Sequence, residues 1–214
     1  MKQFLIKRSG EKLILLLAGW SMDETPFVDI AEIPVVGDVS AMDILVCYDY
    51  RSLDFDSKLL ANYSDITLVT WSMGVWVAEQ IVFAENVTRF IAINGTGAPV
   101  DDRLGIPVDI FNGTLDTLND SNLVKFNRRM SREGFAEFNA RKPKRAMVEI
   151  VDELRLIGER SVIGSKGLVN WDVAVVSTRD YIFPAENMCN YWKNKGVDVV
   201  EIDAPHFPFR YLYE

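Results

Sequence analysis

A serine between two regular segments is the residue whose setting first suggests chemistry. Ser72 follows Asp65–Val69, an apolar and β-branched run typical of a buried strand, and precedes Gly74–Ala84, which has helical length and no proline. A sharp strand-to-helix turn lifts a serine hydroxyl out of the backbone and can present it as a nucleophile. The string Thr70–Gly74 departs from G-x-S-x-G by its threonine. On this motif alone, an ordinary helix-capping serine is an equally good interpretation.

Two further residues supply the base and the acid that a serine nucleophile needs. His206, the one histidine of the chain, follows Val197–Ile202, the last strand-like run. Asp180 follows another such run, Val173–Ser177. An imidazole takes the serine proton, and a carboxylate holds the imidazole in the correct tautomer. The chain order serine, aspartate, histidine is that of the α/β-hydrolase fold. We therefore predict a triad of Ser72, Asp180 and His206.

The loop after the second strand-like run is the expected site of an oxyanion hole. The continuously apolar run 12–18 leads into Ala18-Gly19-Trp20. In α/β-hydrolases one backbone N–H of the oxyanion hole comes from this loop, and the other comes from the residue after the nucleophile. By position these are the N–H groups of Trp20 and Met73. The loop often begins with histidine and glycine, so Ala18 is a departure, although the role belongs to the backbone.

The remaining pattern predicts a mainly parallel sheet with helices on both faces. Seven runs are strand-like: 1–7, 12–18, 42–48, 65–69, 88–94, 173–177 and 197–202. Segments of helical length, including 56–63, 74–84 and 185–195, alternate with these runs as in α/β folds. Between the first two strands, Arg8–Glu11 has the character of a hairpin turn. The length of 214 residues suits a single domain.

One long segment interrupts this alternation. From about residue 119 to 160 there is no strand-like run, and 123–130, 134–140 and 145–157 all look helical. We predict an inserted helical cap that covers the active site. Phe126, Phe135 and Phe138 could line its underside, although core packing is the more common role for any one of them.

The cap segment also carries most of the local positive charge. The chain has a net charge of −8, which argues against general nucleic-acid binding. Residues 125–145 hold eight basic and two acidic side chains, a net charge of +6. Such a patch can dock an acidic partner, and a solvated helical face is the alternative. The docking candidates are Arg128, Arg129, Arg132, Arg141, Lys142, Lys144 and Arg145.

The composition points to a cytoplasmic protein without a metal or cofactor. One histidine and two cysteines, Cys47 and Cys189, give too few ligands for a zinc site. Both cysteines are expected to be reduced thiols. The apolar run Leu13–Ala18 is too short for a signal peptide or a membrane span.

Taken together, the motifs resemble one small family of α/β-hydrolases. Ala18-Gly19-Trp20, the W-S-M-G-V-W string at 71–76, Asp180 and Pro205-His206-Phe207 look like the BioG type of pimeloyl-[acyl-carrier-protein] methyl ester esterase. The resemblance implies removal of the methyl ester from a pimeloyl chain in biotin synthesis, through an acyl-serine. It also implies an acidic acyl carrier protein as partner, and apolar walls for the pimeloyl chain from Trp20, Trp71 and the cap phenylalanines. No cofactor is implied.

Two other functions fit the same residues. One is a general carboxylesterase or thioesterase of this fold that has no preference for a carrier. The other is a hydrolase-like binding protein without catalysis, which would be expected to have lost a member of the triad.

Overall fold

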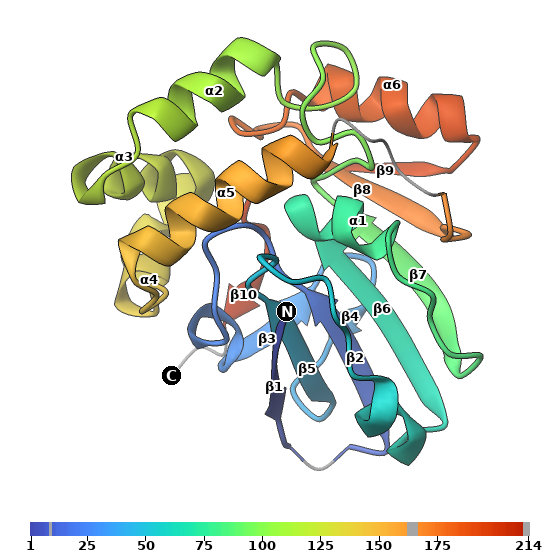
Figure 1. Ribbon diagram of the computed structural model, residues 1–214. Coiled ribbons are helices and arrows are strands. Elements are labelled where there is room, and N and C mark those ends of the chain that lie inside the picture. Colours follow the sequence, from blue (N-terminus) through green and yellow to red (C-terminus); the bar gives the residue numbers. More distant parts are fainter. Residues whose placement is uncertain (9, 162–166, 212–214) are drawn as a thin grey trace.

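The computed structural model describes residues 1–8, 10–161 and 167–211, which fold around one seven-stranded sheet (Figure 1). The strands lie in the order β1-β5-β2-β6-β7-β8-β9. All neighbouring pairs are parallel except β1 with β5. The bounds are β1 (Lys2–Ile6), β2 (Lys12–Leu17), β5 (Asp43–Tyr48), β6 (Asp65–Trp71), β7 (Val87–Ile93), β8 (Val173–Ser177) and β9 (Val199–Ile202). The predicted α/β-hydrolase class is confirmed.

The predicted hairpin between the first two strands is wrong. β5 lies between β1 and β2, and Leu45 is in register with Leu5 on one side and Leu15 on the other. After the exposed Lys12, β2 is apolar and buried at every residue, as expected of a strand with a neighbour on each side. β1 alternates exposed and half-buried residues, as an edge strand can. Ser9 of the predicted turn lies outside the described residues.

The two faces of the sheet are covered differently. In Figure 1, α1 (Met73–Ala78) lies in front of the central strands, and α6 (Ala185–Lys195) packs on β8 and β9. Behind the sheet lies a three-stranded antiparallel sheet of β10 (Arg210–Tyr211), β3 (Ile30–Ile33) and β4 (Gly37–Asp38). The predicted bounds of α6 match, and Gly196 ends it with a φ of 69°. α1 is shorter than expected. Two short 3-10 helices, η1 (Thr25–Phe27) and η2 (Ser57–Asn62), complete this part of the fold.

Helices between β7 and β8 form the cap at the top of Figure 1. They are α2 (Val108–Asp116), α3 (Asp120–Ser131), the 3-10 helix η3 (Arg132–Gly134), α4 (Phe135–Ala140) and α5 (Met147–Ser161). α2 precedes the range expected for the cap. Its Asn112, Gly113 and Thr114 are weak helix formers, which hid it in the sequence. Within the described ranges, no helix is long and apolar enough to cross a membrane.

Candidate active site

Ser72 occupies a strained turn between β6 and α1. Its backbone angles, φ of 58° and ψ of −125°, lie in a region that residues other than glycine rarely adopt. A hydrogen bond of 2.9 Å from its N–H group to the Ile93 carbonyl ties the turn to β7. Thr70 replaces the first glycine of the usual pattern without conflict, because its buried hydroxyl donates to the Ile91 carbonyl at 3.2 Å. The tight approach lies at Gly74, where a Cβ atom would collide with the Leu17 carbonyl oxygen.

This close approach makes Gly74→Ala destabilising. We expect the free energy of unfolding to fall by about 2–3 kcal/mol, since backbone of β2 would have to move to admit the methyl group. Denaturant titration measures the loss. Gly113→Ala in α2 is the matched control, because a Cβ atom there meets nothing within 4 Å. Equal stabilities of the two variants would show that the elbow has room to spare.

The structure brings the three predicted triad residues together in one buried chain of hydrogen bonds. His206 Nε2 lies 2.9 Å from Ser72 Oγ, and His206 Nδ1 lies 2.6 Å from Asp180 Oδ2. The second carboxylate oxygen of Asp180 accepts the N–H groups of Ile182 and Phe183 at 2.7 and 2.9 Å. With the Nδ1 proton donated to Asp180, Nε2 is free to accept the serine proton. The geometry is that of general-base activation of a hydroxyl.

Side chains from the sheet hold the backbone of His206. Its carbonyl accepts the Trp71 indole N–H at 2.7 Å and the Asn94 amide at 2.9 Å. The same amide group donates to Ser177 Oγ at 2.8 Å, and Asn94 Oδ1 accepts the Ser177 N–H at 2.7 Å. Asn94 therefore links the ends of β7 and β8 to the histidine loop. Sequence reasoning did not single it out, although an asparagine between an apolar strand-like run and Gly95 was a visible signal.

The two predicted oxyanion donors border the serine. Both Trp20 and Met73 line the cavity above Ser72. No hydrogen bond from either backbone N–H group is found among the described residues. The Trp20 indole N–H donates to the Ile150 carbonyl of α5 at 2.9 Å. Because α1 has six residues only, negative charge would be stabilised by these local N–H groups rather than by a long helix.

A narrow apolar cavity lies between the elbow and the cap. Trp20, Trp71 and Phe126 line it as predicted, and the rings of Trp20 and Phe126 meet edge to face at 5.1 Å. The two other cap phenylalanines do not reach it. Phe138 is fully buried against Phe207 at 5.1 Å, and Phe135 lies under the Arg128 guanidinium at 4.8 Å. Walls that the sequence did not reveal come mainly from residues before the expected start of the cap, namely Ile106, Ile110 and Phe111, and from Tyr181.

The basic residues of the cap fall into separate groups. Arg128, Arg129, Arg132, Lys142 and Lys144 are exposed. Arg129 lines the cavity, and Arg132 lies 4.4 Å from the ring of Tyr181. Arg141 is half-buried, with Asp29 3.3 Å from it and the Tyr211 ring at 4.4 Å.

Arg145 is unsuited to the docking role that the sequence suggested. Its side chain is 3% exposed and pairs with Glu153 at 2.6 Å and with Asp49 at 3.2 Å. A guanidinium group engaged in this way below the surface cannot meet a carrier protein. Charge counting along the chain could not separate it from its exposed neighbours.

The possible metal ligands and the two cysteines were also located in the structure. Over the ranges 1–8, 10–161 and 167–211, no group of three or more histidine, cysteine, aspartate or glutamate residues is arranged to hold a metal ion. Cys47 and Cys189 are free thiols, and burial raises the pKa of the Cys47 thiol.

Comparison with known proteins gives matches over nearly the whole of this chain. A family model described as pimeloyl-ACP methyl esterase BioG matches residues 1–213. The malonyl-[acyl-carrier protein] O-methyltransferase of Bacteroides fragilis is 40% identical over 208 residues, which are 95% of this chain and 41% of that protein. An uncharacterized protein of Haemophilus influenzae is 38% identical over 214 residues, covering 98% of this chain and 94% of the relative. The chain thus spans less than half the length of the first relative.

Solved structures agree with these matches. The crystal structure of BioG from Haemophilus influenzae has a TM-score of 0.83 at 36% identity, over 96% of this chain and 94% of that one. A bromoperoxidase from Bacillus anthracis has a TM-score of 0.67 at 12% identity, over 95% and 88% of the two chains. The second likeness supports the fold alone. The family resemblance found in the motifs is confirmed, and the chain belongs to the pimeloyl-ACP methyl esterase BioG family.

Proposed function

We propose that this protein is a serine carboxylester hydrolase that removes the methyl ester from pimeloyl-acyl-carrier-protein methyl ester in biotin biosynthesis. The observation that carries the proposal is the buried chain Ser72–His206–Asp180 beneath an apolar cavity. Membership of the BioG family supports the choice of substrate. The proposal places the enzyme in the cytoplasm, where its two thiols stay reduced.

The mechanism follows from the geometry. His206 Nε2 accepts the Ser72 proton as the serine oxygen attacks the ester carbonyl carbon. The Trp20 and Met73 N–H groups receive the negative oxygen of the tetrahedral intermediate. His206 then protonates the leaving methoxide, which departs as methanol. Water, deprotonated by His206, attacks the acyl-serine and releases the free carboxylate. Throughout, Asp180 orients the imidazole and stabilises its charged form.

The cavity has a continuation that suits a long, carrier-linked substrate. A surface groove between α2 and α3 shares Ile110, Thr114, Phe126 and Arg129 with the cavity. Lys125 lines its outer part. The pimeloyl chain would lie in the apolar cavity, and the carrier's prosthetic arm would follow this groove to the surface. Positive charge from Lys125 and the neighbouring arginines favours an acidic carrier there.

The test compares two esters. Pimeloyl-carrier methyl ester and a short p-nitrophenyl ester are hydrolysed by the wild-type protein at low and at high ionic strength. A strong preference for the carrier ester that weakens with salt supports the proposal. Efficient turnover of the short ester alone would indicate a general carboxylesterase or thioesterase. Turnover of neither would point to a hydrolase-like binding protein.

Charge removal beside the cavity should weaken carrier recognition selectively. We expect Arg128→Gln combined with Arg132→Gln to lower kcat/KM for the carrier ester about tenfold at low ionic strength, because both are exposed cations of the cap and Arg132 lies 4.4 Å from the ring of Tyr181, which lines the cavity. The p-nitrophenyl ester should be unaffected. Lys58→Gln with Lys193→Gln, also exposed but outside the cap, is the matched control. Equal losses on both esters would remove the docking idea.

A further inference from the structure

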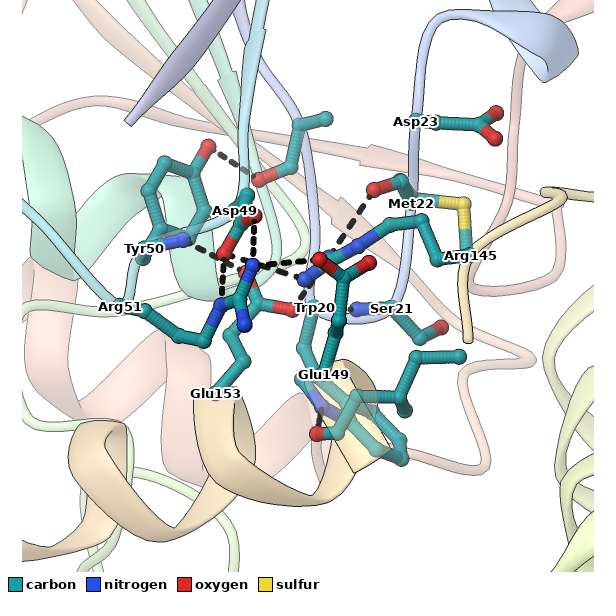
Figure 2. A network of polar contacts seen from close by, with 12 residues as sticks. Trp20, Ser21, Met22, Asp23, Asp49, Tyr50, Arg51, Arg145, Glu149 and Glu153 are labelled. Atoms are coloured by element: carbon teal, nitrogen blue, oxygen red, sulfur yellow. Dashed lines mark hydrogen bonds and ion pairs between the residues drawn. The ribbon is translucent and has the colours of Figure 1, made fainter. Parts of the chain in front are cut away.

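The loop that carries the Trp20 N–H group is hydrogen-bonded to the cap at four consecutive residues, and Figure 2 draws these contacts except that of Asp23 with Lys144. The Trp20 indole and the Ser21 N–H group donate to residues of α5: Ile150 carbonyl at 2.9 Å and Glu153 Oε2 at 3.3 Å. The Met22 carbonyl accepts from Arg145 at 3.2 Å, and Asp23 Oδ2 accepts the Lys144 N–H at 2.7 Å. Each residue from 20 to 23 thus has a partner between 144 and 153.

Glu153 stands at the centre of these contacts. Its carboxylate is fully buried and also accepts the Tyr50 N–H at 2.8 Å, so it joins the loops that follow β2 and β5. Arg145 pairs with it at 2.6 Å and reaches Asp49 at 3.2 Å. Burial raises the pKa of Glu153, while Arg145 and the two backbone N–H groups oppose that shift. A buried carboxylate is costly unless it is paired and hydrogen-bonded, and here each of its oxygens has a donor.

The contacts leave the peptides around Trp20 little freedom. Before it, the Ala18 carbonyl accepts the Tyr50 hydroxyl at 2.7 Å. After it, Ser21 has a φ of 68°, a conformation that serine holds only when its surroundings impose it. The Ser21 N–H bond to Glu153 fixes the plane of the Trp20–Ser21 peptide, and the indole bond fixes the Trp20 side chain. The Trp20 N–H group belongs to the Gly19–Trp20 peptide, which lies between these two fixed peptides. Its direction is therefore restricted by Tyr50 on one side and by the cap on the other.

We propose that Glu153, held by Arg145, is a positioning residue for the oxyanion hole: it aims the Trp20 N–H group at the oxygen that becomes negative. The inference rests on the proposed ester hydrolysis, because only there does this N–H group have a task. Arg145 keeps the pair neutral, which prevents the carboxylate from opposing the oxyanion. Glu153 of α5 thereby promotes turnover without contacting the substrate.

The test is Glu153→Gln, assayed with the p-nitrophenyl ester. A glutamine amide has one acceptor oxygen, so its NH2 group must face a donor, either the Tyr50 N–H or the Ser21 N–H with Arg145, and Arg145 loses its ionic partner. The link between the two loops is broken in either case, so the Trp20 loop should lose its fixed direction. We expect kcat to fall about 100-fold with KM little changed, since a misaimed oxyanion donor acts only in the transition state. Glu159→Gln, the same change at an exposed position of α5, should leave kcat unaltered.

A second readout separates positioning from mere stability. A trifluoromethyl ketone forms a tetrahedral adduct with the serine and places a negative oxygen in the hole. The inhibition constant of the ketone should rise by the same factor by which kcat falls. Partial unfolding would instead lower the apparent kcat and leave the inhibition constant unchanged. A folded Glu153→Gln protein with wild-type kcat, or with wild-type affinity for the ketone, overturns the proposal.

A further variant covers the case in which Glu153→Gln does not fold. Arg145→Met with Glu153→Met removes both charges and retains side-chain volume, an exchange that buried pairs often tolerate. It should fold and still lose kcat about 100-fold, because Ser21 and Tyr50 lose their acceptor. Amide hydrogen exchange across 19–23 should be faster than in the wild type. Unchanged exchange and kcat in this variant would also overturn the proposal.

The outcomes also distinguish this inference from the proposed function. If the wild-type protein cleaves the short ester but not the carrier ester, the proposed substrate is wrong. The test of Glu153 with the short ester remains valid in that case. If the wild type cleaves neither ester, the exchange of 19–23 in the two variants still decides whether Glu153 fixes the loop.

Discussion

Ser72→Ala should lower kcat for ester hydrolysis about a million-fold, the loss known when a serine nucleophile is removed from a triad. The hydroxyl lies 2.9 Å from His206 Nε2, and alanine leaves no oxygen to form the acyl intermediate. The fold should be kept, because no side-chain capping bond from Ser72 supports α1. The measurement is turnover of the p-nitrophenyl ester and of the carrier ester, with circular dichroism to verify folding.

Ser131→Ala is the matched control for this variant. Ser131 is also buried, and its hydroxyl donates to the Asn127 carbonyl within α3 at 2.7 Å. Activity of the control should be close to that of the wild type. A Ser72→Ala protein that retains more than about a tenth of wild-type activity would rule out Ser72 as the nucleophile, since a triad serine has no substitute of that efficiency.

Asp180→Asn should lower kcat about 10⁴-fold, as expected when the triad carboxylate becomes an amide. The reason lies in the local hydrogen bonds. The N–H groups of Ile182 and Phe183 donate to Oδ1 of Asp180 at 2.7 and 2.9 Å, so the oxygen of an asparagine amide stays on that side. The amide nitrogen then faces His206 Nδ1 and donates to it. The imidazole must carry its proton on Nε2, where it can no longer accept the serine proton.

The Asp180→Asn prediction concerns chemistry more than stability. The asparagine is nearly isosteric and keeps both backbone partners, so KM and the melting temperature should change little. Asp203→Asn is the control, because the Asp203 side chain is 82% exposed and its ion pair is with the surface residue Arg179. If kcat of Asp180→Asn fell by less than about tenfold, another group would have to orient His206.

The proximity of Ser72, Asp180 and His206 was predictable because each residue follows a strand-like run, in a fixed chain order. Ser72, Asp180 and His206 each lie just beyond a run whose composition indicates a strand, and parallel strands bring their carboxyl ends to one edge. The seven strands of the main sheet were recovered for the same reason. The pairing of β1 was missed, since two runs joined by a short turn look alike whether or not a third strand lies between them.

The cap was harder to predict than the sheet. Helical spacing identified α3, α4 and α5, but weak helix formers hid α2 and with it Ile110 and Phe111 of the cavity. Spacing also cannot tell which side of a helix faces the cavity, so Phe138 was named as a candidate for the cavity lining although it packs on Phe207. Arg145 was counted as a surface charge because the sequence did not reveal its buried partners. Asp49 is distant in the sequence, and nothing in the pattern of α5 marks Glu153 as buried.

The contacts between α5 and residues 20–23 have a consequence for redesign of substrate preference. Exchange of the cap for that of another esterase is an obvious way to alter acyl-chain length. α2 and α3 supply the cavity walls Ile110, Phe111 and Phe126, so they are the segments to exchange. Residues 144–153 fasten the Trp20 loop and belong with the sheet. A chimera joined after α4 would change selectivity and keep the machinery intact, whereas one that replaces α5 would inherit a reactive serine with a poor turnover.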